Sequence, residues 1–100
     1  MFIHYVNFWL KPGTAQAAKD RLITDCRTLL GSIPTVRQLW AGPPAMTPRD
    51  VVDNSYDVAL CVIFDDTAGH DVYQTHPLHH EFIARNKAHW DRVIVRDFIG

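Results

Sequence analysis

Cysteine is scarce in this sequence, and several other features that would define a class of function are missing. Only Cys26 and Cys61 occur among the 100 residues, without a CxxC pattern, as is common in a reducing cytoplasm, where we expect this protein. No apolar stretch approaches the roughly 20 residues of a membrane span, and the first four residues lack the charged start of a signal peptide. Ten basic and eleven acidic residues form no basic run, so we expect neither a membrane nor nucleic acid as a partner.

Apolar residues make up 47% of the chain, which is typical of a globular protein. A chain of this length has room for one hydrophobic core, so residues 1–100 are expected to form a single domain. Residues 2–10 alternate between two mostly apolar faces, which indicates a strand covered on both sides. Lys11-Pro12-Gly13 should end that strand.

The remaining elements are predicted from apolar spacing and from capping residues. Thr14 is expected to cap a helix that ends at Gly31, and Asp65-Asp66-Thr67 should cap a short helix. His76 should break that helix because a residue before proline avoids the α conformation, and Pro77 suits the first position of the next helix. The other predictions are strands at 36–41, 56–64 and 92–99, helices at 67–73 and 77–89, and a loop at 43–55 with a turn of helix at 49–51.

The order β-α-β-β-α-α-β predicts an α+β protein with a ferredoxin-like fold, in which helices cover one face of a four-stranded antiparallel sheet. The other face would be too apolar to remain in water. We therefore expect a homodimer in which two sheets pack face to face, a dimeric α+β barrel. The alternative is a monomer with scattered apolar surface residues. The side chains predicted on this face are Ile3, Tyr5, Trp9, Cys61, Ile63, Ile94 and Phe98.

Groups that can move protons are concentrated between residues 73 and 79. His79 lies one turn before Phe82 and should point towards the sheet, where His4 shares a strand face with Val6. His4, Tyr73 and His79 are therefore predicted to converge on one cavity as catalytic residues. His79 would be a neutral general base and Tyr73 a donor to a developing enolate oxygen. The expected ligand is an apolar, carbonyl-containing small molecule, bound by Val6, Phe8, Leu22, Cys26, Leu39, Leu60, Val62, His76, Phe82, Ile83, Val93 and Val95.

A series of motifs along the chain resembles the stress-responsive dimeric A/B barrel (Dabb) family. They are Ile3-His4-x-Val6-x-Phe8-x-Leu10-Lys11-Pro12-Gly13, Ile33-Pro34-x-Val36, Asp57-x-Ala59-Leu60-x-Val62-x-Phe64, Tyr73-x-x-His76-Pro77-x-His79-x-x-Phe82 and Val95-x-Asp97-Phe98. The resemblance implies the ferredoxin-like homodimer. The family includes the plant polyketide cyclase olivetolic acid cyclase, in which the positions matching Tyr73 and His79 are catalytic and the position matching His4 lies in the pocket. The resemblance thus implies a cyclase-like lyase.

Other interpretations of the same residues remain open. The pocket could serve a non-catalytic small-molecule-binding or stress-response module, and a monooxygenase is a third alternative. His76, His79 and His80 have the spacing of a zinc site, but Pro77 disturbs the helical register and no thiolate is near, so no metal or other cofactor is expected. Tyr73 and His79 could also be core residues with satisfied hydrogen bonds.

Overall fold

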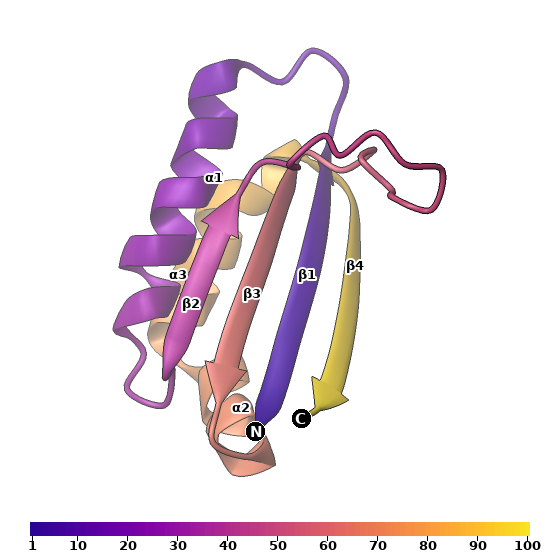
Figure 1. The fold of residues 1–100 in the computed structure, drawn as a ribbon. Coiled ribbons are helices and arrows are strands. Elements are labelled where there is room, and N and C mark those ends of the chain that lie inside the picture. Colours follow the sequence, from indigo (N-terminus) through magenta and orange to yellow (C-terminus); the bar gives the residue numbers. More distant parts are fainter.

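The computed structural model describes residues 1–100 and contains one antiparallel sheet with its helices on one face (Figure 1). The strand order is β2-β3-β1-β4, with β1 and β3 in the centre and β4 at an edge. This arrangement confirms the predicted ferredoxin-like fold. The elements are β1 (Phe2–Leu10), α1 (Gln16–Thr28), a 3₁₀ turn (Leu30–Ser32), β2 (Gln38–Gly42), β3 (Val58–Phe64), α2 (Thr67–Thr75), α3 (Pro77–Asn86), a second 3₁₀ turn (Lys87–His89) and β4 (Trp90–Ile99).

The register of the central strand determines which side chains meet beneath the helices. His4 on β1 lies opposite Val62 on β3 and Asp97 on β4. Two residues further along, Val6 lies opposite Val95 on β4. Residues in register share a face of the sheet, so the helix side of the sheet continues onto β4.

The hydrophobic core lies between the sheet and the helices and thins towards β4. Fifteen apolar side chains form one buried cluster, to which β4 contributes none. Val93 and Val95 on the helix side of β4 remain 39% and 49% exposed. The helices therefore cover β2, β3 and β1 but leave the β4 edge open. The buried cluster consists of Phe2, Val6, Phe8, Leu10, Leu22, Cys26, Leu30, Ile33, Ala41, Val58, Leu60, Val62, Phe64, Tyr73 and Phe82.

The ends of the first helix differ from the prediction. Helix α1 starts at Gln16, and its N-cap residue Ala15 makes no side-chain capping bond. Thr14 instead donates its hydroxyl to the Lys11 carbonyl at 2.6 Å, because it closes the turn after β1, in which Gly13 has φ 82°. Gly31 does not end the helix either: it lies inside the 3₁₀ turn that follows.

Residues 67–86 form two helices that are separated at His76, as predicted. Asp66 caps α2 and accepts a hydrogen bond from the Gly69 amide at 2.9 Å. Helix α2 runs two residues beyond Tyr73 to Thr75, and His76 then takes an extended conformation at φ −67° and ψ 142°. Pro77 is the first residue of α3, which ends at Asn86, before the second 3₁₀ turn.

Strand boundaries shift by about one or two residues at several ends. Strand β2 starts at Gln38 and ends at Gly42, β3 starts at Val58, and β4 begins at Trp90. Asp57 stands outside β3 because its side chain accepts a hydrogen bond from the Leu10 amide at 2.7 Å. Residues 49–51 form no helix: a single backbone bond joins the Val52 amide to the Arg49 carbonyl. No helix is long and apolar enough to cross a membrane.

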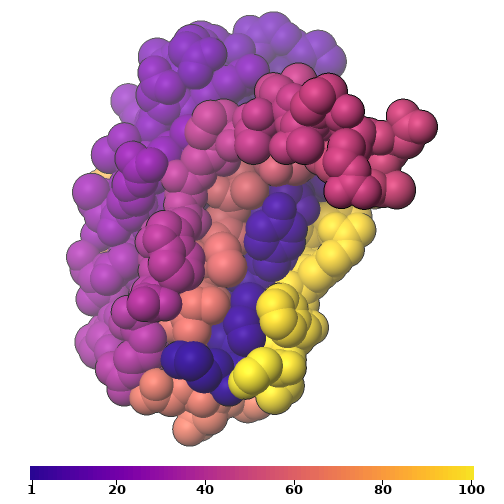
Figure 2. All heavy atoms as spheres, viewed as in Figure 1, coloured from indigo at the N-terminus to yellow at the C-terminus, as the bar shows by residue number.

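The face of the sheet away from the helices has no helix over it (Figure 2) and exposes large apolar side chains. Trp40 on β2 and Phe98 on β4 are each 57% exposed there. The loop between β2 and β3 overhangs one end of this face, where Ser55 accepts a hydrogen bond from the Trp9 indole at 3.0 Å. Cys61 lies on this face, whereas Cys26 is buried on the helix side, and both thiols are free.

Candidate functional site

A cavity of about 160 Å³ lies between α2, α3 and the half of the sheet formed by β1 and β4. Most of its lining is hydrophobic, and its polar side chains come from β1 and from the two helices. Because Val93 and Val95 are partly exposed, the cavity opens towards the uncovered β4 edge. Ten predicted site residues lie on its wall: His4, Val6, Phe8, Leu60, Tyr73, His79, Phe82, Ile83, Val93 and Val95.

Four predicted apolar ligand-binding residues lie outside this wall. Leu22, Cys26 and Val62 are fully buried core residues, and Leu39 on β2 packs against the same core. They do not reach the cavity because α1 packs over β2 and β3 and fills the space above them. Burial also raises the pKa of the Cys26 thiol to about 12, which leaves it protonated and unreactive.

His76 also lies outside the cavity wall, because its side chain has a local structural role. Its Nδ1 accepts a hydrogen bond from the Leu78 amide at 3.1 Å and so caps α3. This bond satisfies one of the free amides at the start of the helix. His76 therefore fixes the joint between α2 and α3, which carry Tyr73 and His79 to the cavity.

Sequence reasoning missed four residues at or beside the cavity. Gln74 and Trp90 line it, and Asp97 and His70 contact His4. The sequence held a signal for two of them. Asp97 has the same strand parity as Val95, and His70 lies three residues before Tyr73 on the same helix.

His4 is held by a partly buried hydrogen bond that crosses from β1 to β4. Its Nδ1 lies 2.7 Å from Oδ1 of Asp97. Because an ionised carboxylate can only accept, Nδ1 is the donor and Nε2 keeps its lone pair. Burial lowers the pKa of His4, and the interaction with Asp97 opposes this shift. At neutral pH the ring is thus a fixed, neutral imidazole.

Tyr73 lies between His4 and His79. Its ring centre is 5.6 Å from that of His4 and 4.8 Å from that of His79, both with edge-to-face geometry. Burial raises the pKa of the Tyr73 phenol well above its ordinary value, so the hydroxyl stays protonated. The pKa of His79 is lowered to about 4, chiefly by burial and secondly by three neighbouring histidines. Nδ1 of His79 and Nε1 of Trp90 are buried without a hydrogen-bond partner.

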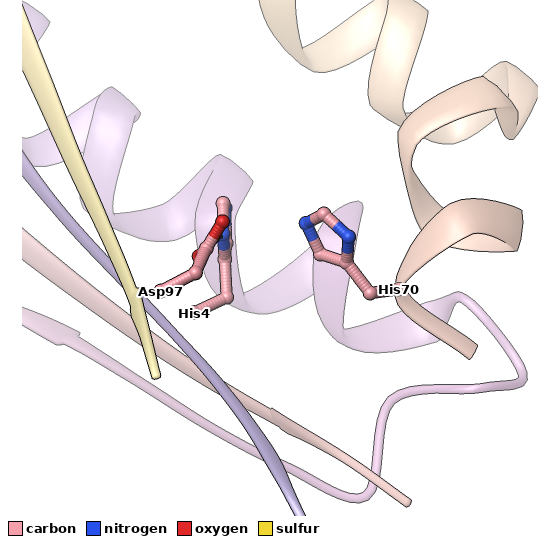
Figure 3. A group of neighbouring side chains, drawn as sticks. All are labelled: His4, His70 and Asp97. Atoms are coloured by element: carbon pink, nitrogen blue, oxygen red, sulfur yellow. Dashed lines mark hydrogen bonds and ion pairs between the residues drawn. The ribbon is translucent and has the colours of Figure 1, made fainter. Parts of the chain in front are cut away.

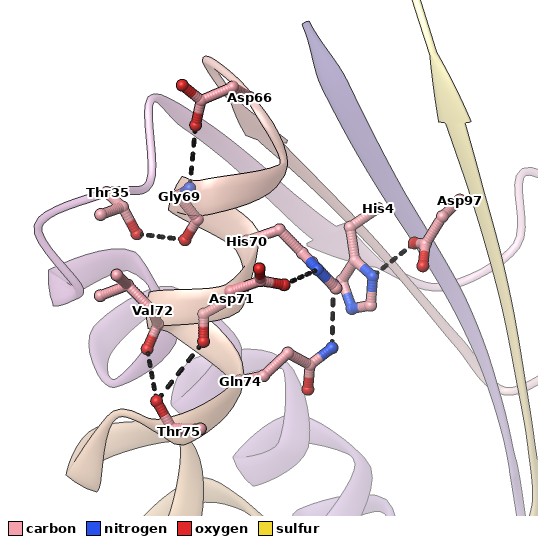
Figure 4. A network of polar contacts seen from close by, with 10 residues as sticks. All are labelled: His4, Thr35, Asp66, Gly69, His70, Asp71, Val72, Gln74, Thr75 and Asp97. Atoms are coloured by element: carbon pink, nitrogen blue, oxygen red, sulfur yellow. Dashed lines mark hydrogen bonds and ion pairs between the residues drawn. The ribbon is translucent and has the colours of Figure 1, made fainter.

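A second group of polar side chains forms at the end of the cavity next to α2 (Figure 4). The ring of His70 stacks on Phe2 with centres 4.2 Å apart, and Gln74 donates to its Nε2 at 2.9 Å. Three possible metal ligands meet here, from His4, His70 and Asp97. Their ligand atoms lie within 4.8 Å of one another, so these three side chains could hold a metal ion. The set weighed from the sequence, His76 with His79 and His80, does not converge.

The chain belongs to the Stress responsive A/B Barrel Domain (Dabb) family, whose sequence model matches residues 2–99. This confirms the family resemblance seen in the motifs. Comparison with curated protein sequences finds no match.

Solved structures share the fold at low sequence identity. A Dabb family protein with a ferredoxin-like fold from Mesorhizobium loti is 23% identical, with a TM-score of 0.80 over 99% of this chain and 95% of that one. A dimeric ferredoxin-like protein of unknown function from Thermobifida fusca is 20% identical, with a TM-score of 0.84 over 99% and 90%. Hydroxynitrile lyase from Passiflora edulis is 19% identical, with a TM-score of 0.82 over 99% and 92%.

Proposed function

We propose that the cavity binds a small molecule with an apolar body and a carbonyl group, and that His79 and Tyr73 act on it as a base and an acid. The observation that carries this proposal is the buried, unpartnered Nδ1 of His79 on a cavity wall next to a buried phenol. Buried polar atoms without partners are rare in proteins, and a catalytic role is one of the reasons for which they occur. His4, held by Asp97, is the third polar group of this site.

His79 would accept the proton. With a pKa of about 4, its ring is neutral at neutral pH and therefore has a free lone pair. Such a ring is a weak base, so the reaction also needs stabilisation of the negative charge that forms on the substrate. That charge would itself attract the proton on His79 and raise its pKa as the reaction proceeds.

Tyr73 would stabilise the charge. Its phenol remains protonated because burial raises its pKa, so it can donate a hydrogen bond to a carbonyl oxygen. In the first step the C–H bond next to the carbonyl breaks, the proton moves to His79, and the electron pair forms an enolate. In an aldol ring closure the enolate carbon then attacks a second carbonyl, and the alkoxide that forms takes the proton back from His79. In an elimination the enolate instead forms a C=C bond, and the group on the next carbon leaves with that proton. The first outcome is the chemistry of a polyketide cyclase-like lyase.

The size of the cavity restricts the group that enters it. A volume of about 160 Å³ is close to that of an engineered cavity of roughly 150 Å³ that holds benzene. Phe8, Phe82 and Trp90 form its aromatic wall, with ring centres 5.1 to 6.2 Å apart. We infer that one ring or a short alkyl group enters and that a longer remainder leaves through the β4 edge.

A catalytic role is tested by hydrogen exchange on acetophenone, a one-ring ketone with exchangeable protons next to its carbonyl. In D₂O the protein should accelerate loss of the methyl proton signal measured by NMR. His79→Ala and Tyr73→Phe should each lower that acceleration roughly 10²-fold or more. His80→Ala is the matched control, because His80 is exposed on the same helix as His79, and it should behave as the wild type.

The same experiment separates catalysis from binding. Ketone that binds without faster exchange would contradict the catalytic assignment and favour the second candidate, a non-catalytic small-molecule-binding or stress-response module. The mostly apolar lining of the cavity is the observation that favours this candidate. If the ketone leaves the NMR signals of the protein unchanged at millimolar concentration, the assignment of the cavity to such ligands is wrong.

We also propose that two copies of the chain pair through the uncovered sheet face. The exposure of Trp40 and Phe98 supports this assignment, since a large apolar patch on a small protein usually marks an interface. Both residues lie opposite the helices, so pairing would leave the β4 mouth of the cavity accessible from the helix side.

A further inference from the structure

We propose that His4, His70 and Asp97 form a binding site for a late first-row divalent cation of the zinc type. The three side chains come from β1, α2 and β4 and meet at the end of the cavity (Figure 3). Figure 3 shows a ring nitrogen of His70 pointing towards His4, whose ring is seen edge-on beside the Asp97 carboxylate. This site goes beyond the proposed acid–base function, in which His70 has no part.

The chemistry of the three ligands selects the kind of ion. Two imidazoles and one carboxylate suit zinc and its neighbours in the first transition row, whereas magnesium and calcium prefer oxygen ligands. Three protein ligands also leave a coordination position free for water or for an oxygen of a bound molecule. One carboxylate beside two neutral imidazoles would partly neutralise a divalent charge.

Two of the proposed ligand atoms already lie side by side. Nδ1 of His4 is 2.7 Å from Oδ1 of Asp97, so a cation held by both would displace the proton that Nδ1 now donates, and the ring would carry its proton on Nε2. Nε2 of His70 is unprotonated, because it accepts the Gln74 amide at 2.9 Å. A cation would take the place of the Gln74 hydrogen at Nε2 of His70 and of the proton between His4 and Asp97.

The spacing of the group requires a small adjustment. The three ligand atoms lie within 4.8 Å of one another, whereas ligands around a tetrahedral zinc are about 3.4 Å apart. His4 is held in the sheet and only 5% of its side chain is exposed, so His70 on the short helix α2 is the residue that would move. Asp97 is 35% exposed at its side chain, which gives an ion a path from solvent.

A cation in this position would lie beside the Tyr73 ring. The centre of that ring is 5.6 Å from the ring centre of His4 and 6.3 Å from that of His70. Its free position would face the polar end of the cavity. There it would act as a Lewis acid on a carbonyl oxygen that enters from the β4 side.

The test is a calorimetric titration of tag-free protein with Zn²⁺, and no substrate is needed. The wild type should bind one equivalent per chain, and Co²⁺ should give the visible absorption bands of a site with nitrogen ligands. His70→Phe keeps an aromatic ring on Phe2 but removes the ligand, so it should abolish this binding. Asp97→Asn should weaken the affinity by roughly tenfold or more.

His80→Ala is the control. This exposed imidazole lies outside the proposed site but belongs to the alternative metal-binding set His76, His79 and His80. It should leave the binding unchanged. Wild-type affinity in His70→Phe, loss of binding in His80→Ala, or no saturable binding to the wild type would each overturn the proposal. The result is independent of the acid–base function, since His79 and Tyr73 stay intact in every variant.

Discussion

His79 combines a lowered pKa with a buried ring nitrogen that has no hydrogen-bond partner. Its Nδ1 is buried and unpaired, and its pKa is lowered from 6.5 to about 4. In most proteins a buried polar atom finds a partner, and an unsatisfied one reduces stability. The proposed ligand would supply the bond that Nδ1 of His79 lacks.

This shift predicts how stability depends on pH. Below pH 6.5 the unfolded chain protonates His79 while the folded chain does not, so lowering the pH favours unfolding until about pH 4. The urea midpoint should fall across this window, and it should fall less in His79→Gln, whose side chain carries no titrating group. Identical pH slopes for the two proteins would show that the ring of His79 is not shielded from solvent.

At the same scale, Asp97 and His70 show what a residue-by-residue reading of the sequence leaves out. Both appeared in the sequence as ordinary polar residues of a strand and a helix. Their importance depends on contact with His4, which lies 93 residues from Asp97 and 66 from His70 along the chain. Strand parity could have placed Asp97 on the helix side, but only the register of β1 with β4 puts it opposite His4.

At the scale of elements, the joint between α2 and α3 determines where the site lies. Pro77 prevents continuation of α2, and His76 both ends that helix and caps the next. Tyr73 and His79 then approach the cavity from different helices, with ring centres 4.8 Å apart. A continuous helix would separate two residues six positions apart by more than one and a half turns.

The cap predicts a measurable loss. His76→Ala removes the acceptor for the Leu78 amide and should destabilise the protein by about 0.5–2 kcal/mol, the usual effect of losing an N-cap. Urea unfolding measures this difference. His76→Asn can restore the cap and should recover most of the stability, and His89→Ala, an exposed histidine outside α3, should change it little. Equal stability of His76→Ala and the wild type would mean that the joint is held by Pro77 and packing alone.

All predicted elements exist except the turn of helix at 49–51, and the other errors concern the ends of elements. The N-cap of α1 failed because Thr14 uses its hydroxyl to close the preceding turn, a competing local bond that the same residue type favours. The cap at Asp66 succeeded because no turn competes with it: its side chain bonds the Gly69 amide. Both outcomes follow from short-range hydrogen bonds. The sequence showed that Thr14 and Asp66 could form such bonds, but it did not show which local partner each side chain would choose.

At the scale of the whole molecule, the sheet presents two apolar faces and one layer of helices. The helices cover one face, and the other exposes large side chains such as Trp40 and Phe98. We have proposed that a second copy of the chain covers this face. Arg92 lies over the Trp9 ring at 4.7 Å on this face, so a charged group already stands beside the apolar area.

Pairing through this face predicts the effect of a buried charge. Phe98→Glu should weaken self-association at least tenfold, because its carboxylate would have to be buried between two sheets. Sedimentation at micromolar concentration measures the change. Val72→Glu is the matched control, since Val72 is 47% exposed on α2 in the helix layer, and it should leave the mass unchanged. Dissociation by Val72→Glu but not by Phe98→Glu would place the interface on the helix side instead.

The sequence by itself determined the order of the elements, the break at His76-Pro77, the two apolar faces and the family. These features depend on local propensity and on the alternation of apolar residues, which neighbouring positions show directly. It also indicated that His4, Tyr73 and His79 share one side of the sheet. The tertiary structure alone decided that the cavity lies between the helices and strands β1 and β4. This position excludes four predicted residues from the cavity wall: Leu22, Cys26, Leu39 and Val62. The tertiary structure also decided that Asp97 and His70 contact His4. Those outcomes depend on strand register and on which helix covers which strand, and both are set by packing between residues far apart in the chain.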